Sequence, residues 1–350
     1  MTPPPSTSPG RAGGLTLVTG GTGFLGAALV SRLLADRAKV RVLARSPTKA
    51  ARLAEQGAEP VVGEITDETA LADALRGVAT VYHLAGRLLV PGVGRDEYRR
   101  THVTGTRLLI SAARREPGLR RFVHCSTTGV LGVTGDHPAD ESAPLRPTNI
   151  YEATKAEAES AVRSEIHAGL PAVIARPGLV YGPGDLHLLG FFRAVLGQRF
   201  WPIGRRPIWF HPIYIDDMVE ALVLCGRSPV AVGECFNIAG PRPVSLVGMA
   251  ATIARAGGTT LPAGRIPLPA ARAVATFGDL LPARLRRAAP LTRGRLDFLT
   301  HSRVYDIAKS RRLLGFVPQT DLSTGVVRSL AWYREQGYLA TAPARMRVGT

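Results

Sequence analysis

The sequence predicts an α/β protein built on a doubly wound parallel sheet, with a smaller C-terminal region beside it. Short apolar runs alternate with helix-like runs through the first half of the 350-residue chain. A glycine-rich turn directly follows the first apolar run. After residue 176 the alternation weakens and Pro and Gly become denser, which indicates a change of architecture. Such strand–helix alternation makes the strands parallel and places helices over both faces of the sheet.

Six apolar runs are predicted as strands of this sheet, at residues 15–18, 40–43, 60–63, 80–84, 121–125 and 172–175. Helices are predicted where apolar side chains recur at one-turn spacing, at residues 24–35, 96–115 and 149–167. Farther on we expect short strands at 213–215 and 235–238, and helices at 245–256 and 323–336. Residues 261–299 are rich in Pro, Arg and Ala and give no clear pattern.

Composition limits the partners of the chain. It carries 44 Lys and Arg against 27 Asp and Glu, a formal net charge of +17. The basic residues are spread out and form no nucleic-acid-binding signature, so no nucleic-acid partner is expected, although phosphate-bearing ligands benefit from the charge. Cys125, Cys225 and Cys235 are odd in number and widely spaced, which predicts neither disulfides nor a metal site and favours a reducing, cytoplasmic compartment.

Two segments bear on membranes. Residues 1–14 are rich in Pro, Ser, Thr and Gly and are predicted as a disordered tail rather than a signal peptide. The longest uncharged run, residues 12–31, is broken by glycines, so no stable membrane insertion is expected. Residues 270–296 resemble a basic amphipathic helix in composition, but Gly278, Pro282, Pro290 and Gly294 interrupt them. We expect a surface lid over the substrate cleft there rather than a membrane anchor.

The glycine-rich turn runs Thr19-Gly20-Gly21-Thr22-Gly23-Phe24-Leu25-Gly26, between the first predicted strand and the first predicted helix. Gly20 permits a tight turn, Gly23 lets the backbone approach a pyrophosphate, and Gly26 lets the helix pack close to the sheet. The start of the helix supplies free N–H groups and a positive dipole end for phosphates. The pattern predicts a dinucleotide site, with a plain structural loop as the alternative.

The end of the second strand bears on which dinucleotide binds. An acidic residue there would hold the ribose hydroxyls of NAD. The chain instead has Ala44-Arg45-Ser46, and Arg45, helped by Arg41 or Lys49, could pair with a 2′-phosphate. NADP is therefore favoured over NAD, the alternative being that Arg45 is merely solvated.

Tyr151 and Lys155 are four residues apart and share one face of a predicted helix. A free phenol has a pKa of about 10, and a neighbouring ammonium together with a cationic nicotinamide favours the phenolate. Lys155 can also hold the nicotinamide ribose. A Ser/Thr-rich strand end, Ser126-Thr127-Thr128, precedes the pair, and this order favours a tyrosine that acts as a catalytic acid and base.

From about residue 15 to residue 336 the chain resembles the extended short-chain dehydrogenase/reductases of the epimerase/dehydratase superfamily, especially the dihydroflavonol-reductase and 3β-hydroxysteroid-dehydrogenase branches. The resemblance rests on the glycine turn, His83-Leu-Ala-Gly86, residues 123–132, residues 151–155, residues 176–183 and Tyr214-Ile-Asp-Asp217. It implies a Rossmann domain that binds NAD(P) over 15–180, with strands returning to it from about 210–240. It further implies a mainly substrate-binding region over 181–340, and a homodimer.

The same resemblance implies roles for individual residues. Tyr151 would be the acid/base, Lys155 would lower its pKa and bind ribose, and Thr127 would donate to the substrate oxygen. The cofactor would contact Gly20, Thr22, Gly23, Phe24, Leu25 and Gly26 of the turn, and Leu84, Ala85 and Gly86 after the fourth strand. Glu64 and Ile65 match a pair that flanks the adenine, and the segment from Pro177 to Val180 would pass under the nicotinamide.

Three departures from the superfamily bear on the substrate. His102 stands where related families often carry Asn, and we interpret it as structural, the alternative being a proton relay that tolerates His. Thr128 and Gly129 follow Thr127 where the 4,6-dehydratases carry Asp-Glu, so dehydratase activity is not expected.

The third departure is aromatic. Trp209 and Phe210 occupy the stretch where nucleotide-sugar enzymes commonly place an Arg, although Arg205 and Arg206 lie nearby in the chain. Together with Thr128, these side chains would line a site for an apolar, ring-shaped substrate. The alternative is that Trp209 and Phe210 are core residues beside a strand.

These observations predict an NAD(P)-dependent oxidoreductase that moves hydride between nicotinamide and a secondary alcohol or ketone, with Tyr151 as acid/base. A nucleotide-sugar epimerase with tightly bound NAD is the alternative. A third possibility, a cofactor-binding protein without turnover, is disfavoured because Tyr151 and Lys155 are both present.

Overall fold

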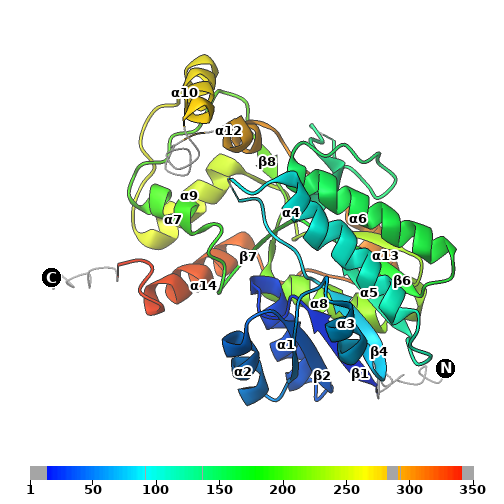
Figure 1. Ribbon diagram of the computed structural model, residues 1–350. Coiled ribbons are helices and arrows are strands. Elements are labelled where there is room, and N and C mark those ends of the chain that lie inside the picture. Colours follow the sequence, from blue (N-terminus) through cyan, green and yellow to red (C-terminus); the bar gives the residue numbers. More distant parts are fainter. Residues whose placement is uncertain (1–13, 91, 136, 282–290, 292, 341–350) are drawn as a thin grey trace, which may run out of the picture.

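The computed structural model describes residues 14–90, 92–135, 137–281, 291 and 293–340. The tail predicted at 1–14 therefore lies outside the described residues except for Gly14. The molecule has a Rossmann core and a smaller C-terminal region above the carboxyl ends of its strands (Figure 1).

The core is a seven-stranded parallel sheet with the order β10-β6-β5-β4-β1-β2-β3. Its strands are β1 (Leu15–Thr19), β2 (Val40–Ala44), β3 (Glu59–Val62), β4 (Val78–His83), β5 (Arg121–Cys125), β6 (Ala172–Pro177) and β10 (Cys235–Ile238). The order of the strands reverses between β1 and β4. In such sheets the ligand crevice lies beyond the carboxyl ends of the strands at this reversal.

Helices cover both faces of the sheet because successive strand residues point to opposite sides. Val18, Val42 and Tyr82 pack with α1 (Phe24–Ala35), α2 (Pro47–Glu55) and α8 (Ile215–Arg227). Leu17, Val81 and Phe122 pack on the other face with α3 (Glu68–Leu75), α5 (Gly105–Ala113) and α6 (Ile150–His167). Both sides of each central strand are buried, which explains the nearly continuous apolar runs in the sequence.

The C-terminal region has its own core, formed around Phe192, Met249, Ile253 and Leu330. Its elements are β7 (Leu179–Tyr181), α7 (Leu189–Leu196), β8 (Trp209–Phe210), β9 (Pro212–Tyr214), β11 (Val244–Ser245), α9 (Leu246–Gly257), α10 (Leu268–Leu280), α12 (Arg293–Thr300) and α14 (Leu322–Glu335). In contrast, α13 (Ala308–Leu314) packs against β10 and α8 of the Rossmann core. β7 pairs with β9, and β8 pairs with β11, in two small sheets separate from the main one.

The structure differs from the sequence predictions in three places. The single helix predicted at 96–115 is instead α4 (Arg95–Arg99), a π-helical turn (Arg100–Thr104) and α5. The strand predicted at 213–215 ends at Tyr214, and α8 begins at Ile215. The unassigned segment 261–299 contains α10 and most of α12, and Gly278 lies on the buried side of α10 without ending it.

Segments 282–290 and 292 lie outside the described residues. None of the helices within the described ranges is both long enough and apolar enough to cross a bilayer.

Candidate active site

A cavity of about 490 Å³ opens where the strand order reverses, between the core sheet and the C-terminal region. Fourteen of the residues singled out from the sequence line it: Gly20, Gly23, Phe24, Leu25, Gly26, Leu84, Gly86, Thr127, Thr128, Tyr151, Lys155, Pro177, Val180 and Phe210. They come from the carboxyl ends of β1, β4, β5 and β6, from the starts of α1 and α6, and from β7 and β8. Thr22, Arg45, Glu64, Ile65, Ala85 and Trp209 lie outside this lining.

The glycine turn has the shape that a pyrophosphate cradle needs. Gly20 has φ +74°, and a Cβ added there would meet the backbone of Leu84. A Cβ on Gly26 would collide with the carbonyl oxygen of Gly20. The N-cap of α1 is Gly23, which has no capping side chain, and the first turn holds no acidic residue. The first N–H groups of α1 therefore keep their capacity to bind an anion, and the residues present fit a dinucleotide.

The adenine end of the predicted site lies beside the cavity. Arg45 follows β2 and is exposed, and Ser46 caps α2 by accepting from the backbone N–H of Lys49. Arg41 is committed elsewhere, because it donates to Glu59 at 2.8 Å and to backbone carbonyls at the end of α3. These contacts hold the Arg41 guanidinium against the end of α3 and β3.

Glu64 and Ile65 follow β3 and differ in burial. Ile65 is 8% exposed and packs at Gly105, where no side chain larger than hydrogen fits. Glu64 is exposed and pairs with Arg100 at 3.1 Å. The pair thus presents one apolar and one solvated side chain beside the end of β3.

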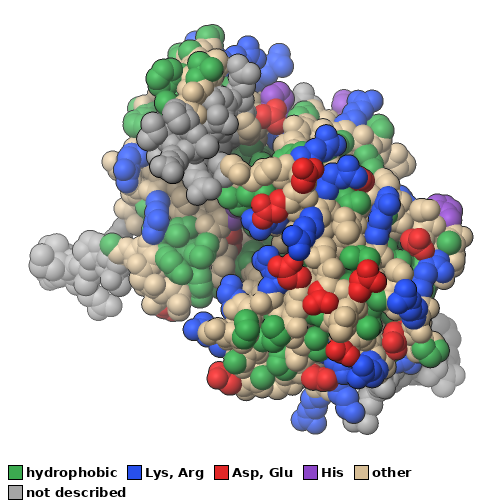
Figure 2. Space-filling model, in the orientation of Figure 1, with side chains coloured by type: hydrophobic (Ala, Val, Ile, Leu, Met, Phe, Trp, Pro, Cys, Tyr) green, Lys and Arg blue, Asp and Glu red, His purple; other side chains and the backbone are tan. Residues whose placement is uncertain are grey.

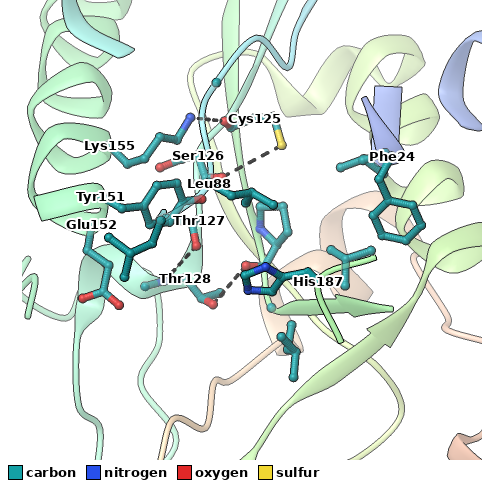
Figure 3. Close-up of a pocket in the computed structure, with 18 of the residues that line it drawn as sticks. Phe24, Leu88, Cys125, Ser126, Thr127, Thr128, Tyr151, Glu152, Lys155 and His187 are labelled. Carbon is teal, nitrogen blue, oxygen red and sulfur yellow. Dashed lines mark hydrogen bonds between the residues drawn. The ribbon is translucent and has the colours of Figure 1, made fainter. Parts of the chain in front are cut away.

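Thr127, Tyr151 and Lys155 converge on one wall of the cavity (Figure 3). Tyr151 and Lys155 extend from the same face of α6, and Phe24 lies on the opposite side of the cavity (Figure 3). Asn149 fixes the start of this helix, because its side chain accepts a hydrogen bond from the backbone N–H of Glu152. The spacing of four residues, read from the sequence, has therefore produced the expected shared face.

Burial dominates the electrostatics of Tyr151 and Lys155. Burial raises the pKa of Tyr151, and a hydrogen bond with Thr127 acts in the opposite direction. Burial lowers the pKa of Lys155, whose Nζ donates to the carbonyl oxygen of Cys125 at 2.6 Å. Burial thus disfavours the charged form of both side chains.

His102 links the loop after β4 to α6. Its Nε2 accepts a hydrogen bond from the backbone N–H of Arg87 at 3.0 Å, so the proton sits on Nδ1, 2.8 Å from the hydroxyl oxygen of Thr154. Its ring meets the Tyr151 ring edge to face, with centroids 5.6 Å apart. Burial lowers the pKa of His102 to about 3, and the nearby Lys155 charge adds to this effect. These contacts agree with a structural, neutral His102.

A second buried histidine extends this network toward the glycine turn. His83 Nδ1 lies 2.8 Å from the hydroxyl of Thr19, which accepts from the backbone N–H of Ala85. His83 Nε2 lies 2.8 Å from the hydroxyl of Thr106, which in turn donates to the carbonyl oxygen of His102. The two histidines thus join β1, the β4 loop and the π-helical turn into one hydrogen-bonded unit.

A buried ion pair supports the strand end that carries Thr127. Glu159 and Arg176 are 0% and 1% exposed, and Arg176 donates to both oxygens of the Glu159 carboxylate, at 2.6 and 3.0 Å. The Ser126 hydroxyl donates to the same carboxylate at 2.7 Å. Arg176 holds the pKa of Glu159 below its usual range despite the burial. The pair therefore ties α6 to the carboxyl ends of β5 and β6.

The far wall of the cavity comes from the C-terminal region. Phe210 is 3% exposed and stacks on Phe298, with ring centroids 4.6 Å apart. Arg303 lies over Phe298 and pairs with Asp297 at 2.9 Å. Trp209 points away from the cavity and is 38% exposed, since neighbouring strand residues face opposite sides.

Several lining residues carry no signal in the sequence. Phe298, Arg303 and Tyr305 reach the cavity from segments more than a hundred residues beyond Tyr151 along the chain, and nothing local marks them. Leu88, Glu152 and His187 also line it. Only Glu152 had a readable signal, because Asn149 followed three residues later by Glu is a helix-start pattern.

Residues 16–239 match the NAD dependent epimerase/dehydratase family, and the chain belongs to this family. It is 32% identical to "Sterol demethylase protein B" of Methylococcus capsulatus, over 93% of this chain and 99% of that protein. It is 31% identical to "3 beta-hydroxysteroid dehydrogenase/Delta 5-->4-isomerase" of Mycobacterium tuberculosis, over 91% of this chain and 90% of that one.

Among solved structures, that of gox2253 superimposes with a TM-score of 0.77 at 28% identity, covering 93% of this chain and 99% of the other. The chain is therefore an NAD(P)-dependent enzyme of the extended short-chain dehydrogenase/reductase type, as its motifs predicted.

Proposed function

We propose that this enzyme reduces a ketone on an apolar, ring-shaped substrate, with Tyr151 as the proton donor. The observation that carries the proposal is the shape of one cavity. Thr127, Tyr151 and Lys155 form one wall. Phe210 and Phe298 of the C-terminal region form a second, aromatic wall. Aromatic walls bind flat apolar molecules, and the names of two relatives specify sterol or steroid.

The chain's own residues supply binding and proton transfer. A bound nicotinamide dinucleotide supplies the reducing equivalents for the carbonyl carbon. The Thr127 and Tyr151 hydroxyls would donate hydrogen bonds to the carbonyl oxygen and polarise it. Tyr151, kept protonated by burial, would then pass its proton to that oxygen. Lys155 has three N–H donors and spends one on the Cys125 carbonyl, so it retains donors for ribose hydroxyls.

The test is turnover with a panel of apolar cyclic ketones and NADPH, measured as cofactor oxidised against alcohol formed. Equal amounts of the two products support the reductase proposal. Epimer formation from UDP-sugars, with no ketone consumed and with NAD that survives dialysis, would instead favour the epimerase. Arg303, the cation beside these rings, already pairs with Asp297 at 2.9 Å, and the stacked rings of Phe210 and Phe298 present an apolar surface, which is the reason for preferring the reductase.

We propose that NADP(H) is the preferred cofactor. Arg45 is exposed directly after β2, where the 2′-phosphate of a bound dinucleotide would lie. The Arg45→Glu variant should raise the KM for NADPH about tenfold or more and lower the KM for NADH. Arg52→Glu makes the same charge change on the exposed side of α2 and should leave the KM ratio near that of the parent enzyme. A parent enzyme that prefers NADH would overturn the assignment.

We propose a homodimer formed through the outer faces of α5 and α6. A groove of about 370 Å³ lies between these helices, lined by Arg107, Ile110, Arg114, Ala161 and Glu165 among others. Light scattering after size-exclusion chromatography measures the mass directly. A mass equal to that of one chain at micromolar concentration would contradict the dimer.

We also propose that the enzyme works in the cytoplasm. The three cysteines are all free and buried, which suits a reducing compartment. Fractionation of producing cells, with the protein found outside the cytoplasmic fraction, would contradict this location.

A further inference from the structure

The helix α10 has two apolar faces, and only one of them is covered. Ala271 and Ala275 are buried against Leu296 of α12. On the other side, Val274, Phe277 and Leu280 are 48%, 67% and 78% exposed. At 100° per residue these three lie together on one side of the helix, with the exposed Ala270 and Ala273 between them. An exposed stripe of this kind on a helix marks an interaction surface.

The charge around this helix is one-sided. Residues 197–209 and 258–280 contain five arginines, Arg199, Arg205, Arg206, Arg265 and Arg272, against one acidic residue, Asp279. The two segments lie side by side, because Ile203 and Ile266 form a β-bridge and Arg265 donates to the carbonyl oxygen of Gly204. Within the described ranges, no ion pair neutralises Arg205, Arg206, Arg265 or Arg272, and all four are exposed.

The position of α10 gives this surface a free approach. The helix lies at the end of the molecule farthest from the Rossmann sheet (Figure 1). Hydrophobic side chains cluster at that end, with Lys and Arg side chains beside them (Figure 2). An apolar stripe on a helix with unneutralised arginines near its start matches the interface of an anionic lipid bilayer, where acyl chains lie beneath negative headgroups.

We propose that the exposed face of α10, formed by Val274, Phe277 and Leu280, docks onto the surface of an anionic phospholipid membrane, with Arg205, Arg206 and Arg265, from the segments that precede and adjoin the start of the helix, contacting the headgroups. The helix lies on the bilayer and does not cross it. The covered face of α10 packs on α12, whose Phe298 lines the active-site cavity. Docking would therefore place only α12 between α10 on the membrane and the aromatic wall of the cavity. If the proposed function holds, an apolar substrate dissolved in the membrane would lie close to that wall.

A second copy of the chain is a poorer occupant for this face. Its exposed apolar area amounts to roughly a few hundred Å². A stable protein–protein interface buries about 800 Å² on each partner. The surplus of arginines would also face an identical set of arginines across a twofold axis, which repels rather than attracts.

The test is flotation of the purified full-length chain with vesicles of phosphatidylcholine alone or with roughly 30 mol % phosphatidylglycerol. We expect binding to the mixed vesicles, and we expect it to weaken as NaCl rises from about 0.05 to about 0.5 M. The double variant Phe277→Ser with Leu280→Ser should lose about tenfold or more of the bound fraction. The matched control, Val317→Ser with Val327→Ser, removes side chains that are 61% and 53% exposed elsewhere, and it should bind like the parent.

Both double variants should keep the parent's melting temperature and dinucleotide affinity, which shows that loss of flotation is not loss of folding. A Phe277→Trp variant gives an independent readout, a blue shift of its fluorescence with mixed vesicles. Failure of the parent to float, or equal flotation of the Phe277/Leu280 variant, would overturn the proposal. The proposal would also be overturned if the parent and the control variant were dimers and the Phe277/Leu280 variant were a monomer, because the exposed face of α10 would then bind a second copy of the chain. Docking does not depend on catalysis, so inactive enzyme that still floats would contradict the proposed function alone.

Discussion

The two walls of the cavity are built in different ways. The cofactor wall comes from strand ends that are neighbours in one sheet, and its glycine turn and Tyr151–Lys155 pair are local patterns. The wall proposed for the substrate consists of Phe210, Phe298 and Arg303, whose segments do not belong to the seven-stranded sheet. The first wall is fixed by strand ends of one sheet. In the second, a β-bridge joins Phe210 to Arg303, and ring stacking adds Phe298. Changes to the first should therefore abolish chemistry or binding outright, whereas changes to the second should tune the substrate.

The largest effect is expected for Tyr151→Phe. Removing the proton donor should lower kcat about 100- to 10,000-fold, the usual contribution of general acid catalysis. Dinucleotide affinity should change little, because the ring and its packing remain. Tyr338→Phe removes an exposed phenol and should leave kcat unchanged. Steady-state kinetics and a dinucleotide titration measure both, and a fully active Tyr151→Phe enzyme would refute the assigned role.

The ion pair behind the cofactor wall is next in size. Glu159→Gln leaves the buried Arg176 guanidinium without its counter-charge and should lower the free energy of unfolding by about 3–5 kcal/mol. Arg163→Gln removes the partly exposed neighbour of the same carboxylate and should cost about 1 kcal/mol or less. Urea unfolding compares the two. Equal losses of unfolding free energy in the two variants would show that the buried pair with Arg176 stabilises the protein no more than the partly exposed pair with Arg163.

Lowering the pH should reduce the free energy of unfolding, because two histidines behind this wall are buried and neutral. The pKa of His83 and that of His102 are each lowered to about 3, against an ordinary value of 6.5. The unfolded chain therefore binds protons that the folded chain refuses, so this stability is fully present above pH 6.5 and is lost as the pH falls toward 3. Each histidine should cost about 1.4 kcal/mol per pH unit below 6.5.

Urea unfolding between pH 7 and pH 5 measures that slope. His102→Asn keeps a hydrogen-bonding side chain that does not titrate, so its stability should fall less steeply with acid than that of the parent. His301→Asn makes the same substitution at an exposed position outside this network and controls for the exchange of side chain itself. A parent protein whose stability is flat over this range would contradict the neutral, buried histidines.

The smallest effect is expected on the substrate wall. Phe298→Ala removes the ring that stacks on Phe210 and should raise the KM for an apolar ketone about tenfold, with kcat nearly unchanged. Phe277→Ala removes an exposed ring of α10 outside the cavity and should leave the KM for a water-soluble ketone as it was. If Phe298→Ala lowered kcat as strongly as Tyr151→Phe, the two walls would not differ in the way described.

The sequence by itself determined the parts of this protein that depend on neighbouring residues. The alternation of apolar runs predicted every strand of the core except the exact ends, because a strand buried on both faces must be apolar throughout. The glycine turn and the four-residue spacing of Tyr151 and Lys155 were readable since each is held by a single turn or helix.

Tertiary structure alone decided the rest. The sequence did not reveal that Glu159 and Arg176 would meet, that the helix predicted at 96–115 would widen into a π turn at His102, or that α12 would bring Phe298 to Phe210. Each depends on contacts between segments distant in the chain, and no local periodicity encodes which partners will meet. The pKa of Tyr151 belongs to the same class, since burial by the whole fold outweighs its nearest neighbours.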